Sequence, residues 1–384
     1  MPEDPGTTVR TVAAGVTRRT VPPYYDSPTL ALLTQGVAGL TALRSHDLPT
    51  AAAELHPLGF TVSSGTDPVT RSAAFPAGRP YLMAVSPTGT AREWGLYLLD
   101  ASVPVTVCIA VPHTRADEQC HELALRLWRA IPGALLMMAT VHRDTTWAGQ
   151  VKGTVADQAY NTESLFHHAW TDVFGPPGIP QVQIHGFADR RTGVQAVVST
   201  GSARLTLPAI RIAEQLTRRG LVTTRSWDSS ATELLATGNE QGRAAGVHGW
   251  AWVQVELNAS VRTDPGPSPT LWETAMDAVR SADPALFRPR ATPDPPVLNT
   301  LRNDHFRITL HGNRTLEAPT QVGAHRALVQ VGASGITRTL NFGDSLHRAA
   351  GVPPSVRIAP GHWWYGDLVH AGPHIWLLQH SFTS

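Results

Sequence analysis

The feature that most constrains the fold is a stretch, starting near residue 103, in which buried strands alternate with helical segments. Residues 103–111 (VPVTVCIAV) form a continuous apolar run rich in β-branched residues, which is typical of a strand buried on both faces. The segment 120–131 then repeats apolar residues at helical spacing, with Leu123, Leu127 and Ile131 four residues apart. Strands that alternate with helices form βαβ units, so this pattern predicts a mostly parallel sheet with helices on both faces.

The same alternation continues to about residue 285. Further strands are expected at 134–141, 181–184, 195–199 and 250–257, and further helices at 161–173, 207–219 and 271–279. One face of the segment 161–173 is apolar, and the histidines of SLFHHAW, His167 among them, are expected to face solvent. We therefore predict an α/β core over residues 85–287, built on an open mixed, mostly parallel sheet.

Two other regions flank this predicted core. Residues 1–84 are expected to form a partly flexible N-terminal arm and short strands between Pro and Gly turns. The segment 288–297 (RPRATPDPPV) contains four prolines, which exclude a helix or a central strand and predict a linker. Residues 298–384 contain β-like runs and predict a small β-rich C-terminal module. Its GHWWYGD segment clusters aromatic residues that form part of a core or, where exposed, bind a surface or glycan partner.

Composition and charge exclude several classes of protein. Hydrophobic residues make up 42% of the chain and charged residues 16%, a balance that excludes a long disordered chain. With 31 basic and 30 acidic residues the net charge is +1, so we expect no nucleic-acid partner. We find no apolar run of about 18 residues and no secretory signal, and expect a cytoplasmic or virion-associated protein outside the membrane. The two cysteines are expected to be reduced.

Polar and titratable residues follow three of the predicted strands. His113, Asp117 and Glu118 follow the first strand, His185 follows the strand at 181–184, and Glu256 lies near the end of WVQVEL. In open α/β sheets, ligands bind beyond the carboxyl ends of the strands. A histidine with a nearby carboxylate and a distant second histidine form the ligand set of a catalytic zinc site. A further carboxylate then acts as the general base, and Glu256 has the placement for that role.

Each of these acidic residues also has a purely structural explanation. Asp117 and Glu118 favour the positive N-terminal end of the helix that follows them. Glu256 would be costly to bury alone, and it is satisfied if it pairs with Arg262 or Arg143. Taken together and in this order along the chain, the residues favour a functional site.

Arg143 and His142 lie at the end of another predicted strand, 134–141. An arginine there binds a substrate carboxylate through two parallel hydrogen bonds, or it forms a structural ion pair with Asp144 or Asp157. Both interpretations of Arg143 stay open at the level of the sequence.

Three segments of the chain resemble one enzyme family in order and spacing. PHTRADEQCHELA, QVQIHGF and WAWVQVELNASVR are similar to the phage-type poly-γ-glutamate hydrolases, a group within the zinc carboxypeptidase-like amidohydrolases. The resemblance covers about residues 103–263, and the glycine-rich turn of the family is replaced here by HTRA. The matching positions are His113, Glu118, Glu122–Leu123, His185–Gly186, Gln254, Glu256, Leu257 and Arg262.

The resemblance implies a zinc ion held by His113, Glu118 and His185, with Glu256 as the general base. Asp117 is the alternative carboxylate ligand, and Glu118 is preferred. The candidate substrate-binding residues are Arg143, Arg262 and His142.

The activity implied by the resemblance is zinc-dependent hydrolysis of a peptide, γ-glutamyl or isopeptide amide, including a polymeric one. One alternative is deacylation of an N-acyl amino acid by an enzyme of the same clan, which a pocket closed by an arginine would favour. Another is a virion or cell-surface binding protein that retains a degenerate hydrolase core, which a lack of zinc binding would favour.

Overall fold

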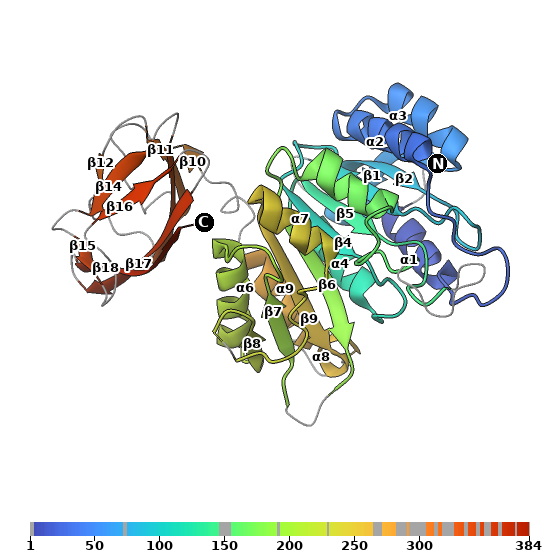
Figure 1. Ribbon diagram of the computed structural model, residues 1–384. Coiled ribbons are helices and arrows are strands. Elements are labelled where there is room, and N and C mark those ends of the chain that lie inside the picture. Colours follow the sequence, from blue (N-terminus) through green and yellow to red (C-terminus); the bar gives the residue numbers. More distant parts are fainter. Residues whose placement is uncertain are drawn as a thin grey trace. The chain divides into compact units, whose positions relative to one another are not determined.

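The computed structural model describes residues 4–71, 75–145, 155–189, 193–228, 230–263 and 271–281, together with short strand segments between 290 and 383. The chain divides into two compact units, residues 1–284 and 285–384 (Figure 1). The larger, N-terminal unit carries every residue that the sequence analysis assigned to the site.

Within its described residues, the N-terminal unit contains a nine-stranded sheet in the order β1-β2-β3-β5-β4-β6-β9-β7-β8. Its strands are β1 (Thr61–Asp67), β2 (Arg79–Val85), β3 (Leu96–Asp100), β4 (Val107–Val111), β5 (Ala134–Met138), β6 (Gln181–Phe187), β7 (Ala196–Ser199), β8 (Thr223–Arg225) and β9 (Trp252–Asn258). This arrangement confirms the expected open mixed α/β sheet.

Parallel pairing is concentrated in the centre of this sheet. β5, β4, β6 and β9 are joined by parallel pairings, and β7 pairs with β8 in the same way. The pairings β1–β2, β2–β3, β3–β5 and β7–β9 are antiparallel. The parallel share is smaller than the sequence predicted, because β1 to β3 follow one another through short connections that allow only antiparallel neighbours.

Helices cover both faces of the sheet (Figure 1). α1 packs on α4, and α4 and α6 pack on α9, while α2 and α7 both pack on η3. The helices are α1 (Pro5–Gly15), α2 (Leu30–Arg44), α3 (Leu48–Leu55), α4 (Cys120–Ala130), α5 (Leu165–His168), α6 (Leu207–Arg218), α7 (Glu240–His248), α8 (Ala259–Thr263) and α9 (Leu271–Ser281), with 3-10 turns η1 (His56–Leu58) and η2 (Pro68–Thr70) and the π-helix η3 (Ala169–Phe174).

The N-terminal region differs from its prediction as a partly flexible arm. It forms α1, α2 and α3 and supplies β1 and β2 to the main sheet, so it belongs to the same compact unit. Leu40 and Leu43 of α2 are fully buried in the cluster that also holds Phe166 and Trp170. Burial of these apolar side chains is what ties the region to the core.

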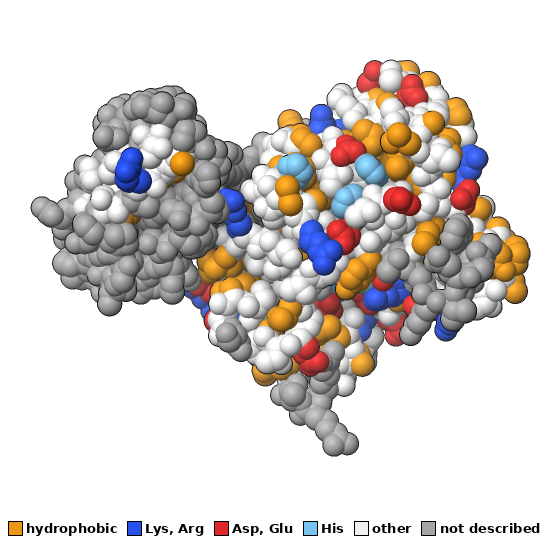
Figure 2. All heavy atoms as spheres, in the orientation of Figure 1, with side chains coloured by type: hydrophobic (Ala, Val, Ile, Leu, Met, Phe, Trp, Pro, Cys, Tyr) orange, Lys and Arg blue, Asp and Glu red, His pale blue; other side chains and the backbone are white. Residues whose placement is uncertain are grey.

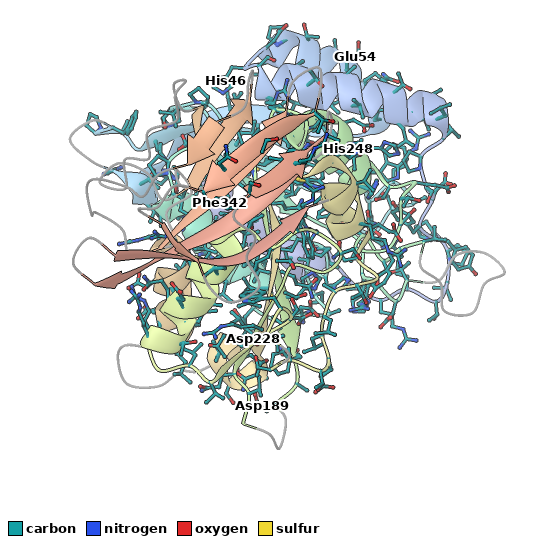
Figure 3. All side chains as sticks on the ribbon, turned by 60° about the vertical axis from the view of Figure 1, so that its left-hand side comes forward. His46, Glu54, Asp189, Asp228, His248 and Phe342 are labelled. Carbon is teal, nitrogen blue, oxygen red and sulfur yellow. The ribbon has the colours of Figure 1, made fainter. Side chains whose placement is uncertain are left out.

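Helix α7 begins and ends with side chains that matter below. Asn239 is its N-cap, and the Asn239 Oδ1 accepts a 3.1 Å hydrogen bond from the backbone N–H of Gly242. At its other end the His248 ring, labelled in Figure 3, stacks on Trp250 with ring centroids 4.4 Å apart. Both ends of α7 are therefore fixed to their surroundings.

β4 lies at the point where the direction of strand addition reverses. The next strand in sequence, β5, lies on one side of β4, whereas β6 lies on the other. Loops that leave such neighbouring strands diverge and open a crevice at the carboxyl ends, where ligands of α/β sheets bind. The fold therefore places a crevice at the ends of β4 and β6.

The C-terminal unit is built from strands alone within its described residues. One sheet has the order β10-β11-β13-β17-β18-β15 and the other the order β12-β14-β16. The strands are β10 (Arg290–Ala291), β11 (His305–Leu310), β12 (Arg314–Leu316), β13 (Arg326–Ala333), β14 (Arg338–Phe342), β15 (Leu346–Arg348), β16 (Ser355–Ile358), β17 (Trp363–Gly372) and β18 (Ile375–Thr383). Apart from β10, the expected linker 288–297 lies outside the described residues.

Among the described residues, no helix has both the length and the apolar character needed to cross a membrane.

Candidate metal centre

Three neighbouring strands carry the principal side chains of the site. His113 lies two residues beyond the end of β4, His185 lies near the end of β6, and Glu256 lies near the end of β9. In the parallel β6–β9 ladder His185 pairs directly with Glu256. Because β4, β6 and β9 run in parallel side by side, residues far apart in the sequence meet at one edge of the sheet.

His113, Asp117 and His185 form a buried cluster with the geometry of a metal site. The Nδ1 atoms of His113 and His185 lie 3.2 Å and 3.3 Å from Oδ2 of Asp117. One ligand atom from each of the three residues can be chosen so that all lie within 4.8 Å of one another. Two imidazoles and a carboxylate directed at one point match the donor set of a catalytic zinc site.

The carboxylate in this cluster is Asp117, and the preference for Glu118 is corrected. The backbone N–H of Asp117 donates to the His113 carbonyl at 2.9 Å, which closes a turn of five residues. This turn brings the fourth residue after His113 back to the histidine and leaves Glu118 exposed. Gln119 then takes a left-handed backbone conformation (φ 66°) that begins α4.

Each histidine uses its second nitrogen to contact an outer partner. His113 Nε2 lies 2.8 Å from Oδ1 of Asp157, and His185 Nε2 lies 3.1 Å from Oε1 of Gln183. Histidines that bind metals in proteins are held in this way by a carboxylate or carbonyl acceptor, which leaves the other nitrogen for the metal. The residues present therefore fit a zinc ion.

Electrostatic interactions in the cluster are strong because it is almost fully buried. Burial alone would lower the pKa of His113, but hydrogen bonds to Asp117 and Asp157 raise it to about 9. Burial opposes ionisation of Asp117, yet its bonds to the two histidines lower its pKa below the usual range. The site thus favours a negative carboxylate that is compensated by positive charge, as a metal ion would supply.

Arg143 lies at the entrance of the cluster and contacts both His113 and its outer partner. Its Nη1 lies 3.1 Å from His113 Nδ1, and its Nη2 lies 3.0 Å from Oδ2 of Asp157. The ion pair with Asp157 is the structural alternative that the sequence left open. The Arg143 side chain is 34% exposed, so it also lines the pocket and can reach a ligand there.

Glu256 is buried beside the two histidines. Burial raises the pKa of its carboxyl group, and the nearby His185 opposes that rise. The Gln254 side chain donates a 2.7 Å hydrogen bond to Oε1 of Glu256. A carboxylate with a raised pKa beside a candidate metal site has the properties of a general base.

Arg262 does not take the substrate-binding position expected for it. It is buried, and its guanidinium donates to the backbone carbonyls of Leu257 and Phe187 at 3.0 Å and 3.1 Å and to that of Glu118. It therefore ties the ends of β6 and β9 to the turn that carries Asp117. At Gly186 a Cβ would lie 2.4 Å from this guanidinium, so glycine provides the necessary space.

His142 also lies outside the site. It is partly buried, burial lowers its pKa, and its Nδ1 accepts a hydrogen bond from the backbone N–H of Asp144 at 3.2 Å. It does not line the pocket described next, so its predicted role in substrate binding is not supported by its position.

A pocket of about 190 Å³ opens over the cluster. Figure 2 shows histidine side chains close to acidic and arginine side chains on one face of the N-terminal unit. The lining residues are His113, Asp117, Arg143, Ala159, Tyr160, His185, Gly186, Leu234, Ala236, Asn239, Gln254 and Glu256. The candidate metal ligands, Glu256 and Arg143 therefore share one small cavity.

Three groups of this site were not predicted from the sequence. Asp157 was considered only as a partner of Arg143, whereas it also contacts His113. Gln183 and Asn239 were not considered at all, although Asn239 donates a 2.7 Å hydrogen bond to Gln183 behind the metal cluster. The alternation of polar residues in QVQIH and WVQVE could have indicated Gln183, because alternate residues of a strand share one face.

Comparison with solved structures finds chains of low sequence identity. A metallo-carboxypeptidase from Pseudomonas aeruginosa, solved with (2-guanidinoethylmercapto)succinic acid, has a TM-score of 0.32 and 13% identity, covering 62% of this chain and 67% of that chain. A metallo-carboxypeptidase from Burkholderia cenocepacia has a TM-score of 0.32 and 13% identity, covering 62% and 68%. A succinylglutamate desuccinylase from Silicibacter sp. has a TM-score of 0.32 and 10% identity, covering 84% and 95%. No family model and no curated protein matches the sequence.

Proposed function

We propose that this protein is a zinc-dependent hydrolase of amide bonds, with His113, Asp117 and His185 as the metal ligands. The observation that carries the proposal is the convergence of two histidine Nδ1 atoms on the Asp117 carboxylate, with Glu256 beside them in the same pocket. When bound, zinc supplies a Lewis acid that polarises a carbonyl and lowers the pKa of water.

The side chains around the cluster have distinct parts in this reaction. Glu256, whose raised pKa suits proton transfer, takes a proton from the attacking water and passes it to the leaving amine. Arg143 is held by Asp157, and its other guanidinium N–H groups, including the one that faces His113 Nδ1 while no metal is bound, can donate to an anionic group of the substrate. Asp157 and Gln183 hold the two histidines in place.

The size of the pocket favours a short substrate over a long polymer. Its volume of about 190 Å³ is below the roughly 300–1,000 Å³ of common ligand pockets. With Arg143 in its wall, such a cavity suits a compact substrate with a carboxylate, which supports deacylation of an N-acyl amino acid as the second candidate. A peptide or γ-glutamyl substrate remains the first candidate of the sequence analysis, and its terminal residue would enter the same cavity.

Zinc content measured by elemental analysis tests the metal centre. The purified protein is expected to hold about one zinc per chain, as a three-ligand catalytic site implies. Asp117→Asn should lose most of this zinc, whereas the neighbouring Glu118→Gln should keep it, because Glu118 is exposed. Equal zinc loss in both variants, or a wild type that binds none, would contradict the assignment.

Release of free amine tests the reaction itself. Glu256→Gln is expected to retain zinc while turnover falls by roughly 10²–10⁴-fold, as expected for loss of a general base. N-acyl amino acids, short peptides and poly-γ-glutamate assayed in parallel identify the substrate class. A fully active Glu256→Gln variant would rule out its proposed role.

A further inference from the structure

A chain of buried side-chain amides connects His185 to the indole of Trp252. It lies on the face shared by β6 and β9, where the ladder pairs Gln181 with Trp252 and Gln183 with Gln254. Trp252 Nε1 donates to Gln181 Oε1 at 2.9 Å, Gln183 Nε2 donates to Gln181 Oε1 at 2.9 Å, and Gln183 Oε1 lies 3.1 Å from His185 Nε2. All of these groups are buried.

The indole fixes the direction of every hydrogen bond in this chain. An indole N–H can only donate, so the Gln181 atom facing it must be the oxygen. The Gln183 atom that faces this oxygen must then be the NH₂ group, which leaves the Gln183 oxygen facing His185. An oxygen acceptor requires a proton on His185 Nε2. When the ring carries only this proton, its lone pair is on Nδ1, the atom that faces Asp117; a second proton on Nδ1 would be donated to the Asp117 carboxylate, and a metal ion would displace it.

Asn239 provides a second and independent anchor. Its Oδ1 accepts from the backbone N–H of Gly242, another group that can only donate, so its NH₂ group faces the opposite way. That NH₂ group donates to Gln183 Oε1 at 2.7 Å. Two donors of fixed polarity, an indole and a backbone amide, thus assign the same orientation to the Gln183 amide.

The same network also reaches the proposed base. Asn239 Nδ2 lies 3.5 Å from Gln254 Oε1, and Gln254 Nε2 donates to Glu256 at 2.7 Å. Gln254 is therefore oriented as a hydrogen-bond donor toward the carboxylate. One set of buried amides serves both the histidine on β6 and the glutamate on β9.

We propose that Trp252, Gln181, Gln183 and Asn239 act as a relay that fixes the tautomer of His185. The relay keeps a proton on Nε2, so that Nδ1 is the nitrogen left to bind the metal. These are positioning residues, because they act through His185 and do not themselves bind the metal. The effect of the relay on zinc binding rests on the proposed function. The proton on His185 Nε2, in contrast, can be observed in the metal-free protein.

Nitrogen NMR of the histidine side chains tests the tautomer without metal or substrate. In metal-free wild type, His185 Nε2 is expected to carry a proton, and the signal is assigned by its loss in His185→Gln. Gln183→Leu removes the acceptor and should release a population in which Nε2 is unprotonated. An unprotonated Nε2 in the wild type would overturn the relay.

Zinc affinity, measured by competition with a chromophoric chelator, tests its consequence. Gln183→Leu should weaken zinc binding by roughly 10–100-fold, the usual cost of losing an outer partner. Gln183→Glu keeps an acceptor toward His185 while losing the donor to Gln181, so it should bind zinc more tightly than Gln183→Leu. A network that served stability alone would affect both variants equally, and that result would reject the relay.

Tryptophan variants provide a matched pair at the far end of the relay. Trp252→Phe removes the fixed donor and should weaken zinc binding, whereas Trp250→Phe, which lies outside the relay, should not. Identical zinc affinities for these two variants would contradict the relay. A wild type that shows the Nε2 proton but binds no zinc would contradict the proposed function and leave the tautomer assignment intact.

Discussion

At the scale of single residues, the carboxylate of the candidate metal centre shows where sequence reasoning reaches its limit. Two acidic residues follow His113, and residue type alone does not distinguish them. The turn hydrogen bond from the Asp117 N–H to the His113 carbonyl brings Asp117, and not Glu118, beside the histidine. His113, His185 and Glu256 could be predicted because each lies at or just beyond the carboxyl end of a buried strand. The carboxylate could not, because it depends on a backbone turn rather than on a residue pattern.

His167 is a second residue whose surroundings the sequence concealed. It was expected to face solvent, but Gln241 from α7 covers it and donates to its Nδ1 at 3.2 Å. Burial lowers the pKa of His167 to about 4. A helical apolar face identifies which residues pack inward, but it cannot indicate a partner that arrives from more than 70 residues away in the sequence.

The lowered pKa of His167 predicts a loss of stability in mild acid. The unfolded chain binds a proton near the ordinary pKa of about 6.5, whereas the folded chain resists until about 4. The His167 contribution is therefore complete above pH 6.5 and disappears as the pH falls toward 4. The loss relative to neutral pH amounts to about 2 kcal/mol at pH 5.

Urea unfolding of metal-free protein at pH 7.5 and pH 5 measures this effect. His167→Gln retains a hydrogen-bond acceptor for Gln241 but cannot be protonated, so its free energy of unfolding should decrease less between the two pH values. Parallel losses in wild type and variant would show that His167 does not titrate as described.

At the scale of elements, the two central strands carry more information than their apolar character suggests. β6 and β9 were predicted as buried strands, and both are. Their alternate positions, however, hold glutamines, a histidine and a glutamate that pair across the ladder. A buried polar residue requires a partner, so such alternation indicates a hydrogen-bonded network. The register that joins the two strands was beyond the sequence, because it depends on which strands become neighbours.

Arg262 of α8 holds these elements together through hydrogen bonds to their backbone carbonyls. Its removal takes the guanidinium hydrogen bonds away from the carbonyls of Phe187 on β6, of Leu257 on β9 and of Glu118 in the Asp117 turn. Arg262→Met should therefore lower the free energy of unfolding by about 3 kcal/mol and weaken zinc binding. Arg126→Met is the control, because Arg126 on α4 stacks on Trp272 at the surface. Urea unfolding and chelator competition that give equal results for the two variants would contradict this role.

At the scale of the whole molecule, the alternation of strands and helices predicted the class of fold but not how much of the chain joins the main sheet. The parallel centre of the sheet follows from βαβ units. The antiparallel side includes β1 and β2 from a region that had been separated from the core. Short polar strands such as β1 (TVSSGTD) carry little apolar signal, so their membership in a sheet becomes visible only through their neighbours.

Zinc should stabilise only one of the two units of the chain. A ligand that binds the folded state alone adds about 2.7 kcal/mol at a concentration of 100 Kd, which corresponds to a rise of about 5 °C in melting temperature. Calorimetry of the full chain should show this rise for the N-terminal unit, and Asp117→Asn should abolish it. A shift that persists in Asp117→Asn would place the zinc elsewhere.

The position of β9 has a consequence for how the polypeptide folds as it is synthesised. β7 and β8 are translated before β9, yet β9 lies between β6 and β7 in the finished sheet. Among the described strands, the β7–β8 pair therefore joins the rest of the sheet only through β9. Until the ribosome has released residues 252–258, the nascent chain keeps two open strand edges, and open edges invite pairing with other chains. Insertion of β9 closes both of these edges in the same step that delivers Glu256 to His185.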